Sequence, residues 1–158
     1  MISNAAAAPV PESALSRIVF VSTATEALSL RRARKLISAA TRNNRALEVT
    51  GLLLYANERF MGTLEGPESA VRLIFERVQN DYRHKNVDML RFEPITERLF
   101  DDWRVSLPNF AVDSATLPAL SPFMSADFDT SEYLEAPNEV YHAMIAFRNA
   151  HTGTQRAR

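Results

Sequence analysis

The chain has 158 residues, of which 46% are hydrophobic, and a net charge of −1 at pH 7, which fits one compact domain with short extensions. The balanced charge argues against a general nucleic-acid or membrane-surface binder, and no apolar run reaches the roughly 20 residues that span a bilayer. Because cysteine is absent, disulfides, thiolate catalysis and cysteine-ligated metals are excluded. The N-terminal segment has no basic region before its four alanines, so we expect no signal peptide and a cytoplasmic protein.

Charge is distributed unevenly along the chain. Residues 17–45 contain seven basic residues and one acid, whereas residues 111–147 contain six acids and neither lysine nor arginine. The two segments could attract each other within one chain or between subunits. Two ordinary solvated faces are the slightly favoured interpretation.

The first predicted elements follow an Ala/Pro/Ser-rich segment, residues 1–14, that we expect to be disordered. Residues 17–22 (RIVFVS) form a β-prone run that predicts the first strand. Ser29 is a suitable N-cap for a helix over residues 30–42, and the apolar stripe of this helix continues to Asn44. A polar side chain at that point indicates either a helix C-terminal residue or a group that faces a polar partner inside.

A hairpin is predicted next, over residues 49–66. The run 52–55 (LLLY) is continuously apolar, as expected for a strand that is buried on both faces. The polar turn 56–59 separates it from a second strand over residues 60–65. Gly62 is unusual there, because a glycine within a strand has no side chain to pack.

The second helix is predicted over residues 67–81, with Pro67 at its first position. Arg77 and Asp81 lie four residues apart on it, and their simplest interpretation is a surface ion pair. Further strands are predicted at 87–92 and 103–107.

The resulting βαββαββ order is typical of an α+β fold with a ferredoxin-like sheet and both helices on one face. An amphipathic helix within residues 111–150 can cover the other face of the sheet.

Two helices side by side on a sheet leave an apolar slot between them. Asn43 and Asn44 end the first helix, and Arg77, Asp81 and His84 lie at the end of the second. Such convergent groups suit a flat heteroaromatic ligand, because an amide pairs with its donor/acceptor edge and a guanidinium with carbonyl or phosphate oxygens. Each residue also has a structural explanation: a helix cap for Asn44, an ion pair for Arg77 and Asp81, and a backbone-satisfied turn for His84.

The region from Arg17 to about Leu107 resembles a BLUF domain, the blue-light sensor module that uses FAD. The resemblance is carried by the blocks RIVFVS, RNN, VTGLLLY, LEG, DYRH and FDDW, with Phe60 between the third and fourth. It implies that the flavin ring lies between the two helices, and that a C-terminal helical cap covers the opposite sheet face and mediates subunit contacts. It assigns flavin contacts to Asn43, Asn44, Arg77, Asp81 and His84, and the family's mobile tryptophan to Trp103.

The sequence departs from the family's pattern at its switch positions. Phe20 stands where the family has an essential tyrosine, Gly62 where it has an essential glutamine, and Val105 where a methionine follows Trp103. Phenylalanine has no hydroxyl to donate a proton, and glycine has no amide to rearrange. The resemblance therefore predicts a signalling protein that binds FAD, FMN or riboflavin but lacks the normal photocycle.

The alternative hypothesis is a flavin-free interaction module on the same scaffold, since Gly62 removes side-chain contacts to the ring edge. Under either hypothesis we expect a homo-oligomer formed through the cap and a downstream protein partner that the sequence does not identify. Enzyme activity has little support, because the chain has three histidines and no carboxylate pair, nucleophile motif or metal-ligand spacing. The predicted organisation is a tail (1–14), a flavin-binding domain (15–110), a linker and cap (111–150) and a second tail (151–158).

Overall fold

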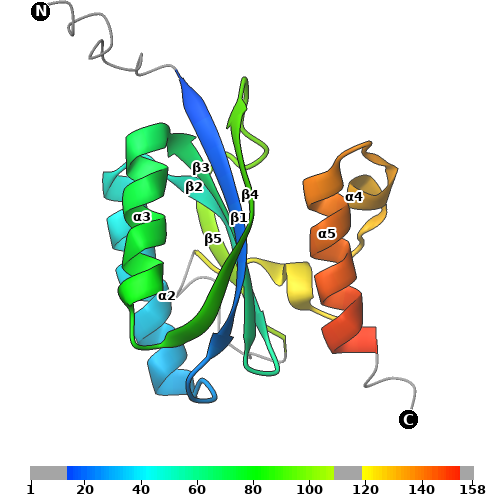
Figure 1. Cartoon of the computed structure of the whole chain (residues 1–158). Coiled ribbons are helices and arrows are strands. Elements are labelled where there is room, and N and C mark those ends of the chain that lie inside the picture. Colours follow the sequence, from blue (N-terminus) through cyan, green and yellow to red (C-terminus); the bar gives the residue numbers. More distant parts are fainter. Residues whose placement is uncertain (1–13, 109–118, 154–158) are drawn as a thin grey trace, which may run out of the picture.

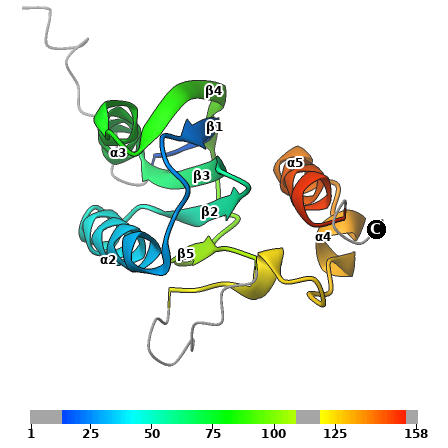
Figure 2. The ribbon, with the colours of Figure 1, turned by 90° about the horizontal axis from the view of Figure 1, so that it is seen from below.

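The computed structural model describes residues 14–108 and 119–153, which fold around one sheet of five strands. Two helices pack on one face of this sheet, and a C-terminal helical segment lies over the other (Figures 1 and 2). The elements are β1 (Leu15–Ala24), α2 (Leu30–Ala46), β2 (Thr50–Ala56), β3 (Arg59–Pro67), α3 (Glu68–Asn80), β4 (His84–Ile95), β5 (Trp103–Ser106), η1 (Pro122–Met124), α4 (Ser131–Glu135), α5 (Glu139–Arg148) and η2 (Asn149–Gly153). In the described part of the chain, no helix has the length and hydrophobicity that a membrane span requires.

The predicted hairpin forms the centre of the sheet. The strand order is β4-β1-β3-β2-β5, so β3 is the middle strand. It pairs antiparallel with β1 and β2, while β1 pairs antiparallel with β4, and β2 pairs parallel with β5. The α+β architecture, with two helices on one face and the cap on the other, is confirmed.

Both main helices were predicted, with small differences at their ends. The Ser29 hydroxyl caps α2 by accepting a hydrogen bond from the Arg32 backbone N–H at 3.2 Å, as expected. The helix then continues to Ala46, so Asn44 lies in its last turns and not beyond its end. Pro67 closes β3 and α3 begins at Glu68, one residue later than predicted.

Side chains alternate between two apolar layers along the central strands. Phe60 and Leu64 of β3 belong to the core beneath α2 and α3, whereas Met61 belongs to the core beneath the cap. Leu53 and Leu54 of β2 divide in the same way. The continuously apolar run of β2 therefore reflects burial on both faces, as predicted.

A buried arginine joins α5 to η1 within the C-terminal helical segment. The Arg148 guanidinium, near the C-terminal end of α5, donates to the Phe123 carbonyl and the Ser125 carbonyl, both at 2.7 Å. The predicted C-terminal tail begins at 151, but η2 continues the helical path to Gly153. Residues 1–13, 109–118 and 154–158, on which the predicted tails and most of the linker fall, lie outside the described residues.

Among the described residues, no ion pair joins the basic segment 17–45 to the acidic segment 111–147, although the sequence left such an attraction open as the less favoured interpretation. Arg17 is buried against Glu65 and Glu93, both at 2.8 Å. The cap is joined to the sheet by another pair, in which Arg91 of β4 contacts Glu139 of α5 at 2.5 Å.

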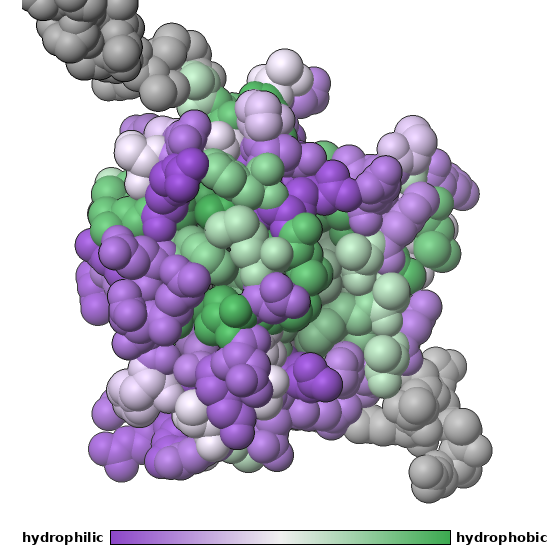
Figure 3. All heavy atoms as spheres, in the orientation of Figure 1, coloured by the Kyte–Doolittle hydropathy of each residue, from purple (hydrophilic) through white to green (hydrophobic). Residues whose placement is uncertain are grey.

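An apolar surface lies over β1 and β4, between α3 and the cap (Figure 3). Its exposed members include Met89, Leu90 and Phe92 of β4, and the Arg72 guanidinium lies 4.4 Å from the centroid of the Phe92 ring. The β1–β4 pairing shifts register near Leu90, which twists this terminal strand of the sheet. Such an irregularity discourages pairing with a further strand.

Candidate functional site

A cavity of about 90 Å³ lies between α2 and α3, above the sheet. Figure 2 shows the two helices side by side on this face. The predicted site residues that line the cavity are Asn43, Asn44, Arg77, Asp81, His84, Phe20 and Trp103. The structure thus brings together, in one slot, residues from β1, α2, α3, β4 and β5 that are distant in the sequence.

Asn44 is the buried amide of this slot. Its side chain is 3% exposed and makes no hydrogen bond with another described residue. The end of α2 is satisfied by backbone groups instead, because the Leu47 and Val49 N–H groups donate to the Asn44 carbonyl at 3.2 and 2.8 Å. Helix capping therefore does not explain the amide, whereas the neighbouring Asn43 is exposed at the rim.

The expected ion pair between Arg77 and Asp81 is absent from the described residues. Helix α3 ends at Asn80, and Asp81 has extended backbone angles, so the helical four-residue spacing no longer applies. The Asp81 carboxylate instead accepts hydrogen bonds from Arg83, including Nη2 at 2.7 Å and the backbone N–H at 2.9 Å. Burial acts to raise the pKa of Asp81, but the hydrogen bonds and charge of Arg83 outweigh it and the pKa is lowered.

Arg77 is left as an exposed cation at the mouth of the slot, without a described partner. Sequence reasoning missed Arg83, which lies within the Asp81–His84 turn and also lines the cavity. An arginine two residues after an aspartate, just past a helix end, was the available signal.

His84 is a buried neutral imidazole at the base of the slot. Its Nδ1 lies 2.8 Å from the Ser22 hydroxyl, and its ring centroid is 4.4 Å from that of Phe60. Burial lowers the pKa of His84 to about 4, despite the opposing charge of Asp81. The hydrogen-bond partner of the His84 side chain is therefore the Ser22 hydroxyl of β1. The structural explanation offered from the sequence, a partner in the turn backbone, is wrong.

The switch positions lie in one row across the sheet. Phe20 of β1 is opposite Gly62 of β3, Gly62 is opposite Leu53 of β2, and Leu53 is opposite Val105 of β5. A Cβ atom added to Gly62 would lie 2.4 Å from Cε1 and 2.5 Å from Cζ of Phe20. The Phe20 ring thus occupies the space that a side chain at position 62 would need.

Trp103 lies in the next row of the sheet, opposite Gly51 of β2. Its side chain is 2% exposed, and its indole Nε1 has no hydrogen-bond partner among the described residues. Gly51 has φ +145°, and a Cβ there would come within 1.8 Å of the Thr63 carbonyl oxygen, so the position requires glycine. Core packing explains the Trp103 ring but leaves its N–H unexplained.

The sequence also gave no site role to Glu65, which is fully buried on the cap side of β3. Its Oε2 accepts from Arg17 at 2.8 Å, and its Oε1 accepts from the Leu99 and Phe100 N–H groups at 2.8 and 3.0 Å. The Tyr141 hydroxyl of α5 donates to the Leu99 carbonyl at 3.4 Å. The loop before β5 is therefore held between Glu65 and the cap.

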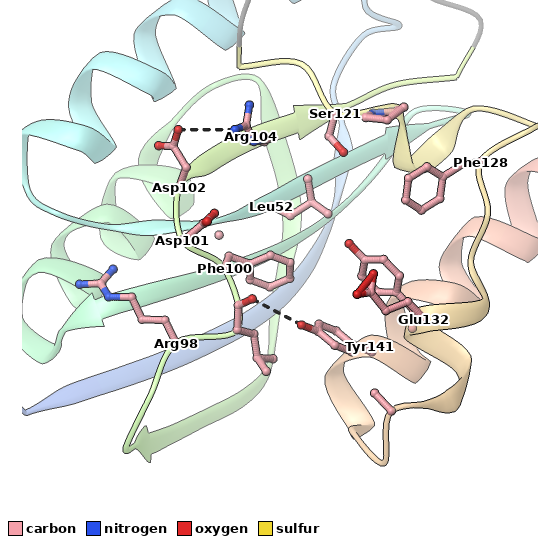
Figure 4. A pocket seen from close by; sticks show the side chains of 15 residues that line it. Leu52, Arg98, Phe100, Asp101, Asp102, Arg104, Ser121, Phe128, Glu132 and Tyr141 are labelled. Atoms are coloured by element: carbon pink, nitrogen blue, oxygen red, sulfur yellow. Dashed lines mark hydrogen bonds and ion pairs between the residues drawn. The ribbon is translucent and has the colours of Figure 1, made fainter.

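This loop borders a groove of about 1000 Å³ between the sheet and the cap. Figure 4 shows Phe100 from the loop and Tyr141 from α5 on facing sides of the groove. Trp103 follows this loop directly, so the loop connects the slot on one face of the sheet with the cap on the other.

Comparisons with known proteins agree with this fold and slot. Residues 15–106 match the model of the BLUF family, described as sensors of blue-light using FAD. The chain is 32% identical over 141 residues to photoactivated adenylate cyclase subunit beta of Euglena longa, a match that covers 87% of this chain and 16% of that protein. It is 32% identical over 73 residues to the blue light- and temperature-regulated antirepressor BluF of Escherichia coli, covering 46% of this chain and 18% of that protein.

Among solved structures, the dark-state structure of the BLUF protein BlrB aligns with a TM-score of 0.59 and 28% identity, covering 88% of this chain and 97% of that one. The fold and slot define a ferredoxin-like sensor domain of the kind that binds flavin. The chain belongs to the BLUF family, whose domain is not itself catalytic. It spans 16 to 18% of the length of the two curated relatives above, in which the matched domain is part of a longer protein.

Proposed function

We propose that this chain is a flavin-binding sensory module that lacks the usual photocycle of its family. The observation that carries the proposal is the contrast within the slot. The polar residues that line it are kept, but the facing pair Phe20 and Gly62 offers neither a hydroxyl nor an amide.

The polar groups of the slot suit a flavin. Asn44 offers a buried amide to the donor/acceptor edge of the ring, and the unpaired Arg77 offers a cation to a carbonyl or phosphate oxygen. His84, held by Ser22 and neutral near pH 7, offers a polar contact without adding charge. FAD is the cofactor that family membership favours, with FMN and riboflavin as alternatives, and when bound it supplies absorption of blue light and redox chemistry.

The volume of the slot sets a condition on binding. The cavity of about 90 Å³ is well below the roughly 300 Å³ at the lower end of small-molecule pockets. A three-ring ligand therefore enters only if side chains of α2 and α3 move apart. Arg77 and Asn43, which are exposed at the rim, can move at little cost because neither has a described partner.

The test is an absorption spectrum of the protein reconstituted with FAD, FMN or riboflavin, recorded before and after blue light. We expect the spectrum of a bound flavin and no reversible red shift on illumination. A reversible red shift would show that the switch still works, and a protein that stays colourless with all three flavins would exclude flavin binding.

A flavin-free interaction module is the second candidate, and the small cavity is the observation that favours it. In both cases we propose that signalling uses a cytoplasmic protein partner and that the chain self-associates through its cap, where Leu134 of α4 is exposed. Sedimentation of the full chain beside a Leu134→Glu variant tests the second point. Equal sedimentation of the two would argue against this contact.

A further inference from the structure

We infer that Trp103 determines ligand specificity in this slot, by donating a hydrogen bond from its indole N–H to an acceptor on a planar heteroaromatic ligand. The inference rests on the proposed flavin binding and adds a residue-level contact to it. It concerns a buried polar group of the slot, the indole N–H, that makes no hydrogen bond with the described residues.

The first observation is that the donor is buried and unused. The Trp103 side chain is 2% exposed, and Nε1 makes no hydrogen bond with the described residues. Buried donors almost always have a partner in folded proteins, and an indole nitrogen can only donate. Because Trp103 is among the residues that line the cavity between α2 and α3, we assign the missing acceptor to a ligand bound in that cavity.

The second observation is that the sheet around Trp103 supplies no acceptor side chain. Its neighbours in the same row across the sheet are Gly51 of β2, Leu64 of β3 and Ile18 of β1, and none of them has a polar side chain. The adjacent row consists of Val105, Leu53, Gly62 and Phe20. Neither row therefore offers a polar side chain as an acceptor for the Trp103 N–H.

The polar groups on the opposite side of the slot do not supply this acceptor. The Asp81 carboxylate is engaged by Arg83, and the His84 Nδ1 by Ser22. The Asn44 amide, like the Trp103 N–H, makes no hydrogen bond with the described residues. The slot therefore presents a donor and an amide, which together select a ring whose edge carries carbonyl oxygens or unprotonated nitrogens over a hydrocarbon ring of the same shape.

A single atom change can test this, because Trp103 is the only tryptophan in the chain. Biosynthetic replacement of tryptophan by 3-benzothienylalanine exchanges the indole N–H for sulfur and keeps the shape of the ring. We expect the full-length analogue protein to bind riboflavin about five- to tenfold more weakly than the natural chain. Tyr55→Phe is the matched control. It removes a hydroxyl, the acceptor for the Leu28 N–H at 3.2 Å, from a side chain outside the cavity lining, and it should leave affinity within about twofold.

The ligand-free protein gives a second measurement. Its ¹H–¹⁵N spectrum has one indole cross-peak, which we expect at the position of an N–H without a hydrogen bond and which should move downfield when riboflavin is added. An indole signal at the hydrogen-bonded position before riboflavin is added would overturn the inference. Equal riboflavin affinity of the natural and benzothienyl proteins would overturn the inference about Trp103 and leave the proposed flavin binding intact. Failure of the natural chain to bind any flavin would overturn both the inference and the proposed function.

Discussion

Phe20 and Gly62 face each other across β1 and β3, and the aromatic ring of one fills the space above the other. A side chain at position 62 would begin 2.4 Å from Cε1 of Phe20, closer than packed carbon atoms allow. The two residues thus depend on each other. The Phe20 ring can take this position only because residue 62 has no side chain, and the ring in turn fills the space that the missing side chain would leave empty.

This dependence predicts the result of a double-mutant cycle. Gly62→Ala should lower the free energy of unfolding by about 1–3 kcal/mol, because the new methyl group overlaps the Phe20 ring. In a Phe20→Leu background the same change should cost clearly less, since the smaller side chain leaves room. Urea unfolding of the four proteins measures the coupling. An equal cost in both backgrounds would mean that the strain arises elsewhere.

The missing switch should not return through one substitution. In the flavin-loaded protein, Phe20→Tyr restores a hydroxyl and Gly62→Gln restores an amide, but each leaves the other group absent. We expect neither single variant to show a reversible red shift under blue light, so that the double variant is the minimum requirement. Difference spectra of the three variants measure this, and a red shift in either single variant would contradict it.

The Asn44 amide should contribute directly to flavin affinity. Asn44→Ala removes a buried hydrogen-bonding group from the slot, and we expect binding to weaken by about 1–3 kcal/mol. Asn80→Ala is a suitable control, because Asn80 ends α3 outside the cavity lining. Flavin titrations followed by fluorescence anisotropy measure the difference. Unchanged binding by Asn44→Ala would place the flavin elsewhere.

The buried His84 should make stability fall in mild acid. Its folded pKa of about 4 lies below the ordinary value of 6.5, so the unfolded chain binds a proton more readily between these values. Stability from this group is complete above about pH 6.5 and is lost as the pH falls toward 4, with a total of about 3 kcal/mol at most. His84→Gln should flatten this dependence in urea unfolding series from pH 4.5 to 7.5.

His151 is the control for that experiment. Burial also lowers its pKa, so it adds a smaller loss of the same sign, which His151→Gln should remove separately. A pH dependence that is unchanged in His84→Gln would assign the acid sensitivity to other groups.

The buried Glu65 should be important for stability and for the loop before β5. Glu65→Gln leaves Arg17 buried with only Glu93 as its ion-pair partner, and we expect a loss of about 3–5 kcal/mol in urea unfolding. Glu93→Gln should cost less, because that carboxylate is partly exposed. Faster amide exchange at Leu99 and Phe100 in Glu65→Gln would confirm that the carboxylate holds the loop, and equal costs for the two variants would contradict its special role.

The fold could be predicted from local patterns because these patterns agree with one another. The apolar run of β2, the Ser29 cap and the βαββαββ order each depend on neighbours in the sequence, and the resemblance of short blocks supplied the family. The end of α2 was less predictable, because Ala46 favours helix as strongly as the residues before it and the chain turns only where Glu48 adopts a φ of 59°.

The site was predictable in its members but not in their contacts. The sequence spacing favoured a pair between Arg77 and Asp81, whereas the real partner is Arg83, because the helix ends before Asp81 and a local turn takes over. The overlap of Phe20 with position 62 depends on the register of two strands about 40 residues apart in the chain, and no local pattern reports it.

Trp103 has a practical consequence for any study of this chain. Because it is the single tryptophan and lies in the slot, the ultraviolet emission of the protein comes from a chromophore beside the ligand site. A bound flavin absorbs where indole emits, so occupancy can be followed by energy transfer without attaching a dye. The chain thus contains its own optical probe for the question that its altered switch raises.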